Sequence, residues 1–165
     1  MPSSWPPFLV SRLRNDLEQL ATSVSSRPKN RSDDEHIWLT RFLLVRTCGY
    51  LEQVTYETAR GYVLEKSGGL VKAFAMSWLD RSRNPSPDNL LELVGRFDLQ
   101  LRSDLDSLFE DDDQRLRREV ALLVDRRNKI AHGLNEGITA SKAISLKADA
   151  EKVSDWFIMN MRPGR

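Results

Sequence analysis

The run Asp34–Lys66, DEHIWLTRFLLVRTCGYLEQVTYETARGYVLEK, decides the fold of this chain. Apolar and small residues recur in it every three or four positions, which is the period of an α-helix. One stripe contains Ile37, Leu44, Cys48, Leu51 and Thr55. An adjacent stripe contains Val45, Gly49, Glu52, Tyr56, Ala59 and Val63. Because apolar residues occupy two sides, the run predicts a long central helix with neighbours on both. Ser32 or Asp33 can cap its start, and Ser67-Gly68-Gly69 ends it.

Helical periodicity continues on both sides of this run, and no segment alternates cleanly enough to predict a strand. The further helices are expected at about Leu9–Val24, Leu70–Asp80, from Ser86 or Asp88 through Phe97 with a turn or more to Phe109, Asp112–Ala131 and Leu146–Met161. A turn-rich loop is expected at 81–87. The fold class is therefore all-α: one compact bundle of about five to six helices. It should span residues 1–165, with a core at 33–161 and an N-terminal helix at 9–24.

The composition of the 165 residues is that of a soluble globular protein, with 40% hydrophobic and 30% charged residues. The net charge is only +1, so a nucleic-acid site must come from local clustering of basic residues. Cys48 is the single cysteine, which excludes an internal disulfide and a cysteine zinc cluster. No stretch approaches the ~20 apolar residues of a membrane span, and the start does not resemble a signal peptide. We therefore expect a cytoplasmic protein without a membrane partner.

The segment Arg127-Asn128-Lys129-Ile130-Ala131-His132-Gly133 holds one of the two histidines in the chain. It closes the helix expected at 112–131, so Arg127 and His132 should lie on the last turns of that helix. Between Gln114 and His132, six arginines and lysines stand against two acids. Positive charge is thus concentrated on the element that carries His132.

An arginine and a histidine placed together can cleave RNA without a metal or a cofactor. The 2′-OH of RNA can attack its own phosphodiester, and an imidazole can accept or donate the proton near neutral pH. A guanidinium stabilises the developing phosphorane charge. Because one histidine cannot be acid and base at the same instant, the chemistry predicts a homodimer that brings two His132 together. The stripe Val45, Gly49, Tyr56 and Ala59 is a candidate part of its interface.

Four further residues are candidates for the same site. Glu52 is expected to pair with Arg127 and offset its charge, unless it is an ordinary surface glutamate. Asn128 shares a helix face with His132 and could serve catalysis, a C-terminal cap or a buried hydrogen bond. Arg126 and Lys129 are expected to contact RNA phosphates, or else to be plain surface charges. Arg127 and His132 themselves could simply hold the end of the helix.

Residues Glu110–Asp113 are four consecutive acids, a residue type that can in principle hold a metal ion. They suit a solvated helix start better, because consecutive helical residues point in different directions. No metal site is predicted.

The order of these elements resembles the HEPN superfamily of small helical domains, and more narrowly its RiboL-PSP-HEPN branch. The residues Arg127–Gly133 match that family's pattern of an arginine, four to six residues and a histidine. Tyr50-Leu51-Glu52-Gln53 and Asn84–Leu90 add support, and the resemblance covers about Asp33–Met161. It implies a metal-independent endoribonuclease that acts as a dimer, frequently as a toxin or antiphage component. Some members of the superfamily are non-catalytic.

The leading hypothesis is therefore an all-α endoribonuclease with RNA as its substrate, active as a homodimer and serving as a toxin or antiphage effector. A non-catalytic HEPN-like module that binds RNA or protein is the alternative. A third hypothesis is an effector subunit silenced by a partner protein, such as an antitoxin, encoded elsewhere.

Overall fold

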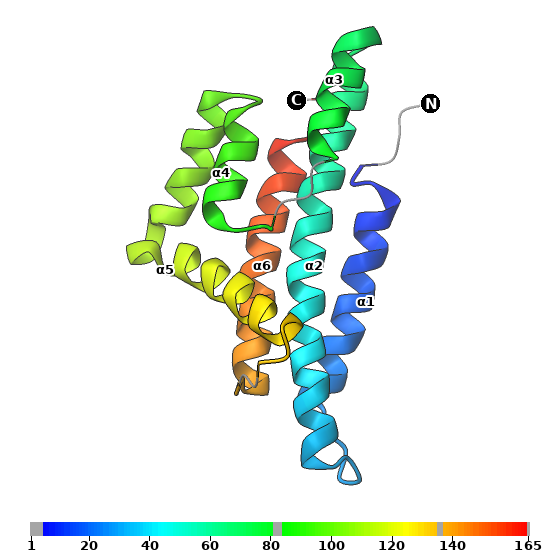
Figure 1. Cartoon of the computed structure of the whole chain (residues 1–165), viewed down its shortest axis with the longest axis vertical. Coiled ribbons are helices and arrows are strands. Elements are labelled where there is room, and N and C mark those ends of the chain that lie inside the picture. The colour runs from blue at the N-terminus through cyan, green and yellow to red at the C-terminus, as the bar shows by residue number, and fades with distance from the viewer. Residues whose placement is uncertain (1–4, 81–83, 135–136, 165) are drawn as a thin grey trace.

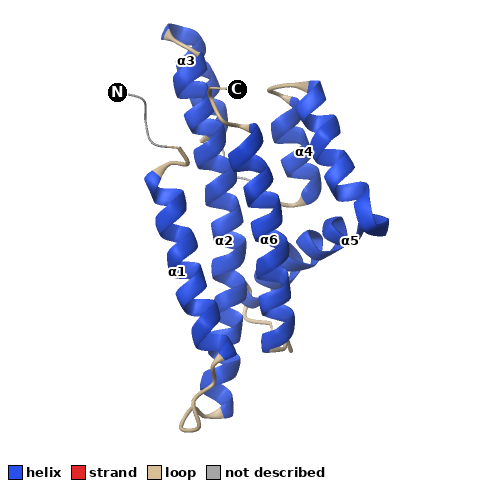
Figure 2. Ribbon diagram, turned by 180° about the vertical axis from the view of Figure 1, so that it is seen from behind, coloured by secondary structure: helices blue, strands red, loops and turns tan. Residues whose placement is uncertain are grey.

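The computed structural model describes residues 5–80, 84–134 and 137–164. Six helices make up most of this part of the chain: α1 Phe8–Ser25, α2 Asp33–Lys66, α3 Gly69–Leu79, α4 Pro87–Gly95, α5 Leu99–Ala131 and α6 Ala140–Asn160. No strand occurs among the described residues (Figure 2), so the predicted all-α class is confirmed. The first three residues of the loop predicted at 81–87 lie outside the described part.

The long helix α2 is the axis of the fold, as predicted. Figure 1 shows α1 and α6 running along it, α3 folding back beside its C-terminal end, and α4 with the first half of α5 forming a separate pair of helices. The core lies where α2 meets α6 and α1, and its fully buried members include Leu43, Leu51, Val54, Val153 and Phe157. None of the helices in the described part of the chain is long and apolar enough to cross a membrane.

The start of α2 is fixed by a capping box. The Ser32 hydroxyl accepts a hydrogen bond from the Glu35 backbone N–H at 3.2 Å, and the Glu35 carboxylate accepts one from the Ser32 N–H at 3.0 Å. These bonds satisfy N–H groups that have no partner inside the helix. Ser32 is thus the cap, and the predicted start at Asp34 is one residue late, because Asp33 already belongs to the first turn.

The two predicted stripes on α2 differ in burial from the expectation at two positions. Leu44, Cys48 and Leu51 are completely buried, as predicted, but Ile37 is 43% exposed because it precedes the part of α2 that its neighbours cover. Ala59 is completely buried within the core of the chain. Its inclusion in a subunit interface was therefore wrong, since another subunit cannot reach it.

The acidic run Glu110–Asp113 lies at a sharp bend in α5. Asp111–Gln114 leave helical geometry, and the φ angles of Asp112, Asp113 and Gln114 are 52°, 52° and 58°. Aspartate tolerates this left-handed conformation better than most residues, and neighbouring carboxylates repel one another in a regular turn. The bend matches the predicted helix boundary near Asp112. It turns the second half of α5 across α2, as Figure 1 shows.

The last helix begins earlier than the predicted Leu146. The Thr139 hydroxyl accepts a hydrogen bond from the Lys142 backbone N–H at 3.2 Å and caps α6 at Ala140. The completely buried Ala143 extends the apolar face of α6 into this added turn. Threonine is a good N-cap, but a small buried alanine gives a weak apolar pattern, which explains the late prediction.

Candidate functional site

The end of α5 is set by a glycine in the left-handed conformation. Gly133 has a φ of +73°, its N–H bonds the Ile130 carbonyl at 3.0 Å, and the Leu134 N–H bonds the Lys129 carbonyl at 2.9 Å. This pair of bonds is the Schellman arrangement that stops a helix. It makes His132 the C-cap residue, and the His132 side chain is exposed to solvent there. Arg127 and His132 therefore lie on the last turns of the helix, as predicted.

Arg127 points from α5 toward α2. Its Nη2 lies 3.3 Å from Glu52 Oε2, and its Nη1 donates to Asn128 Oδ1 at 3.0 Å. The side chains of Arg127 and Glu52 are 29% and 23% exposed, so solvent screens the pair only in part. The expected pairing of Glu52 with Arg127 is present. Two acceptors thus hold the guanidinium, and its remaining N–H groups include donors that a phosphate could use.

A buried thiol borders the Arg127–Glu52 pair. Cys48 lies one turn before Glu52 on α2 and is completely buried. Burial raises the pKa of the Cys48 thiol from its ordinary 9.0 to about 11, although the nearby Arg127 guanidinium acts in the opposite direction. The thiol is therefore neutral near pH 7, and Glu52 supplies the negative charge that faces Arg127. Sequence reasoning predicted the burial of Cys48 but not its position beside the arginine.

The structure does not join His132 to this group. Across the described residues, no hydrogen bond or ion pair links the His132 side chain to Arg127, Asn128 or Glu52. Five helical positions turn a side chain by about 140°, so Arg127 and His132 leave α5 in different directions. Asn128 connects the two residues through the backbone, since its carbonyl accepts the His132 N–H at 3.0 Å. Within the chain, Arg127, Asn128 and Glu52 form one cluster, and His132 lies apart from it at the helix end.

Arg126 and Lys129, the two predicted RNA contacts, are half-buried on the same turns of α5. Lys129 Nζ lies 3.1 Å from Asp125 Oδ2 one turn earlier. Such a pair is partly exposed and weak, so Lys129 can exchange its partner for a phosphate at small cost.

The basic excess counted along α5 is smaller in three dimensions. Arg115 pairs with Asp149 of α6 at 2.9 Å, and Arg117 pairs with Asp88 of α4 at 2.6 Å. Both acids come from elements distant in the sequence, which a local count does not include. Acids from other helices therefore partly neutralise the basic residues of α5.

Metal binding finds no support in this cluster. No group of three or more histidine, cysteine, aspartate or glutamate side chains is placed to hold an ion in the part of the chain that the structure describes.

A family model described as RiboL-PSP-HEPN matches residues 11–157, which is most of the chain and includes Glu52 and the Arg127–His132 segment. The match confirms the resemblance seen in the sequence. No curated protein and no solved structure matches the chain.

Proposed function

Because this chain belongs to the RiboL-PSP-HEPN family, an all-α branch of the HEPN superfamily, we propose that it is a metal-independent endoribonuclease. The observation that carries the proposal is the fixed guanidinium of Arg127, paired with Glu52, two turns or less from an exposed histidine at the helix end. The substrate is RNA, whose own 2′-OH is the nucleophile, so neither a metal nor a cofactor is required.

Arg127 stabilises the transition state in this mechanism. A planar guanidinium held at two points presents its other N–H groups in a fixed direction, which suits the negatively charged phosphorane. Glu52 and Asn128 are positioning residues, because their contacts run to Arg127. Arg126 and Lys129 bind the flanking phosphates and hold the RNA across the end of α5.

His132 moves the proton. Its exposed imidazole either accepts the proton of the 2′-OH or donates one to the leaving 5′ oxygen, and general acid–base help of this kind is worth about 10²–10⁴-fold in rate. The second proton transfer needs a second imidazole. A two-fold homodimer that brings two α5 ends together supplies it.

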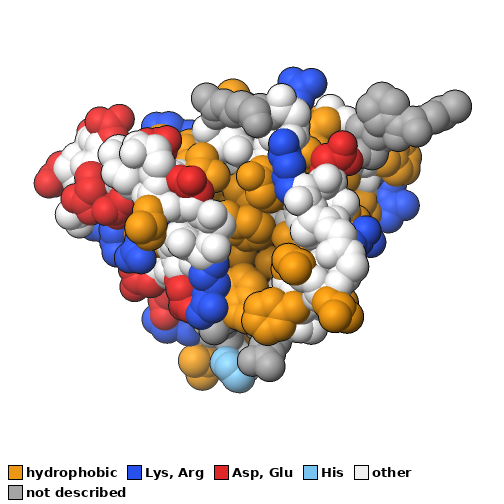
Figure 3. All heavy atoms as spheres, turned by 90° about the horizontal axis from the view of Figure 1, so that it is seen from above, with side chains coloured by type: hydrophobic (Ala, Val, Ile, Leu, Met, Phe, Trp, Pro, Cys, Tyr) orange, Lys and Arg blue, Asp and Glu red, His pale blue; other side chains and the backbone are white. Residues whose placement is uncertain are grey.

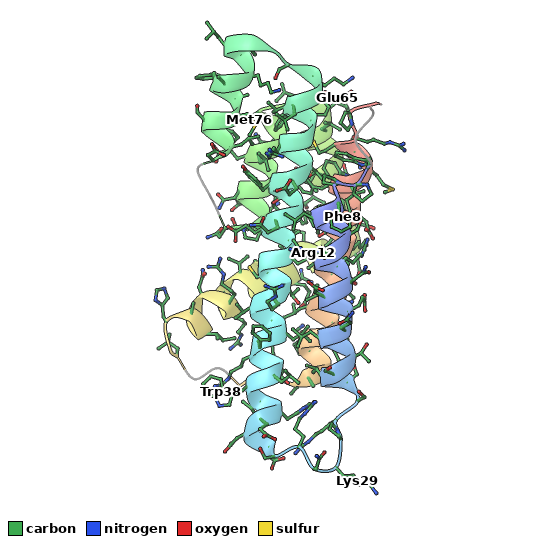
Figure 4. All side chains as sticks on the ribbon, turned by 90° about the vertical axis from the view of Figure 1, so that its right-hand side faces the viewer. Phe8, Arg12, Lys29, Trp38, Glu65 and Met76 are labelled. Carbon is green, nitrogen blue, oxygen red and sulfur yellow. The ribbon has the colours of Figure 1, made fainter. Side chains whose placement is uncertain are left out.

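Exposed apolar side chains near the helix end offer a surface for this dimer. Trp38 and Phe42 on α2 are 64% and 52% exposed, and Leu134, which follows the helix end, is 56% exposed. Figure 4 shows Trp38 on the side of α2 from which the second half of α5 projects. Pairing of this face with its symmetry mate would cover these side chains and draw the two His132 residues toward one cleft. Val45 and Gly49, half-buried on α2, extend the same face.

The test is incubation of the purified protein with transfer, messenger and ribosomal RNA in EDTA. Cleavage that leaves a 2′,3′-cyclic phosphate and a 5′-hydroxyl supports the mechanism, and RNA with a 2′-deoxyribose at the cut site should resist it. The His132→Ala variant should lose most of the rate, and His36→Ala, which changes the other histidine, is the matched control. Full activity of a folded His132→Ala protein would contradict the proposal and favour the non-catalytic alternative.

A role as a toxin or antiphage effector is the biological part of the proposal, supported by the family resemblance. Expression of the wild-type chain in bacterial cells should arrest growth, and expression of His132→Ala should not. Co-expression with a neighbouring gene product would reveal a silencing antitoxin. Equal growth with both chains, at equal expression, argues against a self-sufficient toxin.

A further inference from the structure

Glu52 also borders a cavity that the mechanism does not use. The cavity has a volume of about 280 Å³ and lies between α2, α3, the segment after Asn84 and α4. Its apolar lining includes Trp78, Leu90 and Leu93. Figure 3 views the molecule from above and shows hydrophobic side chains gathered across the middle of that face. Pockets for drug-sized ligands usually span ~300–1,000 Å³, so this one suits a single small planar group.

Two aromatic side chains on the border of the cavity are held in place. The Arg96 guanidinium stacks over the Trp78 ring at 4.3 Å from its centroid. The Tyr56 hydroxyl donates a hydrogen bond to Asp80 Oδ1 at 3.0 Å, which ties α2 to the end of α3. Rigid aromatic side chains are the usual partners of unpaired bases in single-stranded RNA.

The polar rim offers hydrogen-bonding groups with a fixed direction. The Asn89 amide nitrogen donates to the Asn84 carbonyl at 2.9 Å and to Asn84 Oδ1 at 2.8 Å. Within the described residues, these bonds leave Asn84 Nδ2 as a donor and Asn89 Oδ1 as an acceptor without partners. Together with the Asp80 carboxylate, the rim can bond the edge of a base.

The charges on the described part of the lining favour an amino group over a phosphate as the occupant. The charged residues among those described on the lining are Glu52 and Asp80, and both are acidic. A carboxylate repels an anion but accepts hydrogen bonds from amino groups. Adenine, cytosine and guanine carry an exocyclic amino group on the pairing edge. Uracil instead presents one N–H between two carbonyl oxygens. A carboxylate repels those two oxygens.

The position of the cavity links it to the cleavage site. Glu52 lines the cavity and also pairs with Arg127 at 3.3 Å, so a base in the cavity would place its phosphate near the Arg127 guanidinium. We propose that this cavity binds one unpaired base next to the cleaved phosphate and that Asp80 selects bases with an exocyclic amino group over uracil. The proposal rests on the proposed function in taking RNA as the substrate.

The experiment measures binding without cleavage. Short fluorescent single-stranded RNAs that contain only A, only C or only U are prepared with 2′-O-methyl riboses, which cannot attack the phosphate. Fluorescence anisotropy of the full chain in EDTA should show A and C bound about tenfold more tightly than U, the discrimination of one good polar base contact. Equal affinities, or no binding of any of the three RNAs, overturn the proposal.

Two variants assign the selectivity to the cavity. Asp80→Asn should bring the ratio of affinities close to parity, because an amide can also donate to the uracil carbonyls. Asp16→Asn, which changes an exposed aspartate of α1, should keep the wild-type ratio. Leu93→Trp should fill the cavity and weaken binding of A and C to the level of U. An unchanged ratio in both cavity variants, with melting temperatures that show folded protein, overturns the proposal.

The two proposals fail in different ways. Cleavage of ordinary RNA without base-selective binding supports the endoribonuclease and overturns the base pocket. Base-selective binding that depends on Asp80, without cleavage, supports the pocket and overturns the endoribonuclease.

Discussion

Arg127 Nη2 and Glu52 Oε2 lie 3.3 Å apart, although 75 positions separate the two residues in the sequence. The contact ties the last turns of α5 to the middle of α2, and so fixes the motif against the axis of the fold. The pair is partly exposed, so we expect its contribution to stability to be modest and its contribution to cleavage to be larger.

Glu52→Gln should therefore lower the free energy of unfolding by only about 1 kcal/mol or less, while it reduces cleavage more strongly because Arg127 is less well oriented. Arg127→Lys should rescue little of the activity lost in Arg127→Ala, because lysine lacks the planar fork. A double-mutant cycle on cleavage rates would measure the coupling of the two residues. Strictly additive losses would show that Glu52 does not act through Arg127.

Gly133→Ala should destabilise the protein. A Cβ at this position meets open space, so the cost comes only from the φ of +73°, which is about 1–2 kcal/mol for a residue with a side chain. Gly49→Ala is the matched control, since Gly49 lies inside α2 and its Cβ also meets nothing within 4 Å. There alanine should stabilise the helix by about 1 kcal/mol. Chemical unfolding of both variants checks the opposite signs. A Gly133→Ala protein as stable as the wild type would show that the left-handed glycine does not set the helix end.

The buried Cys48 predicts a pH dependence of stability. Its pKa is raised in the folded protein to about 11 from an ordinary 9.0, so the unfolded chain loses the thiol proton first as the pH rises. The part of the free energy of unfolding that depends on the Cys48 thiol is fully present below pH 9. It is lost between about pH 9 and 11, by up to about 3 kcal/mol. Cys48→Ala should flatten this part of the curve of unfolding free energy against pH. Parallel curves for the two proteins would contradict the assignment.

Trp38→Glu tests the proposed dimer face. A charge on a 64% exposed side chain should leave the fold intact but separate the subunits, and cleavage should fall with the dimer fraction. Phe8→Glu, which changes a 75% exposed phenylalanine of α1, is the control. It should keep both the dimer and the cleavage activity. Sedimentation and cleavage are measured together. A Trp38→Glu protein that is as dimeric and active as the wild type would place the interface elsewhere.

The parts of this structure that follow from local physics could be predicted from the sequence. The period of apolar residues placed α2, Ser32 and Gly133 marked helix ends, and the acidic run marked the bend in α5. The features that depend on distant segments could not. The pairing of Arg115 with Asp149 reduces the basic excess of α5, and the cavity beside Glu52 exists only because α3 and α4 meet α2 there. Neither the ion pair nor the cavity produces a pattern in the local sequence.

Two ion pairs near its ends anchor the half of α5 beyond the bend to other helices. Arg115 bonds Asp149 of α6 near its start, and Arg127 bonds Glu52 of α2 near its end. The straight segment between them is a strut of about 18 Å, whose length and rotational phase are both set by the helix. Loss or gain of one residue inside the strut would rotate the motif by about 100° and break one anchor, whereas the same change in the acidic bend leaves both anchors in register. The exposed positions between Arg115 and Arg127 can therefore vary in composition, but the number of residues between the two arginines cannot change.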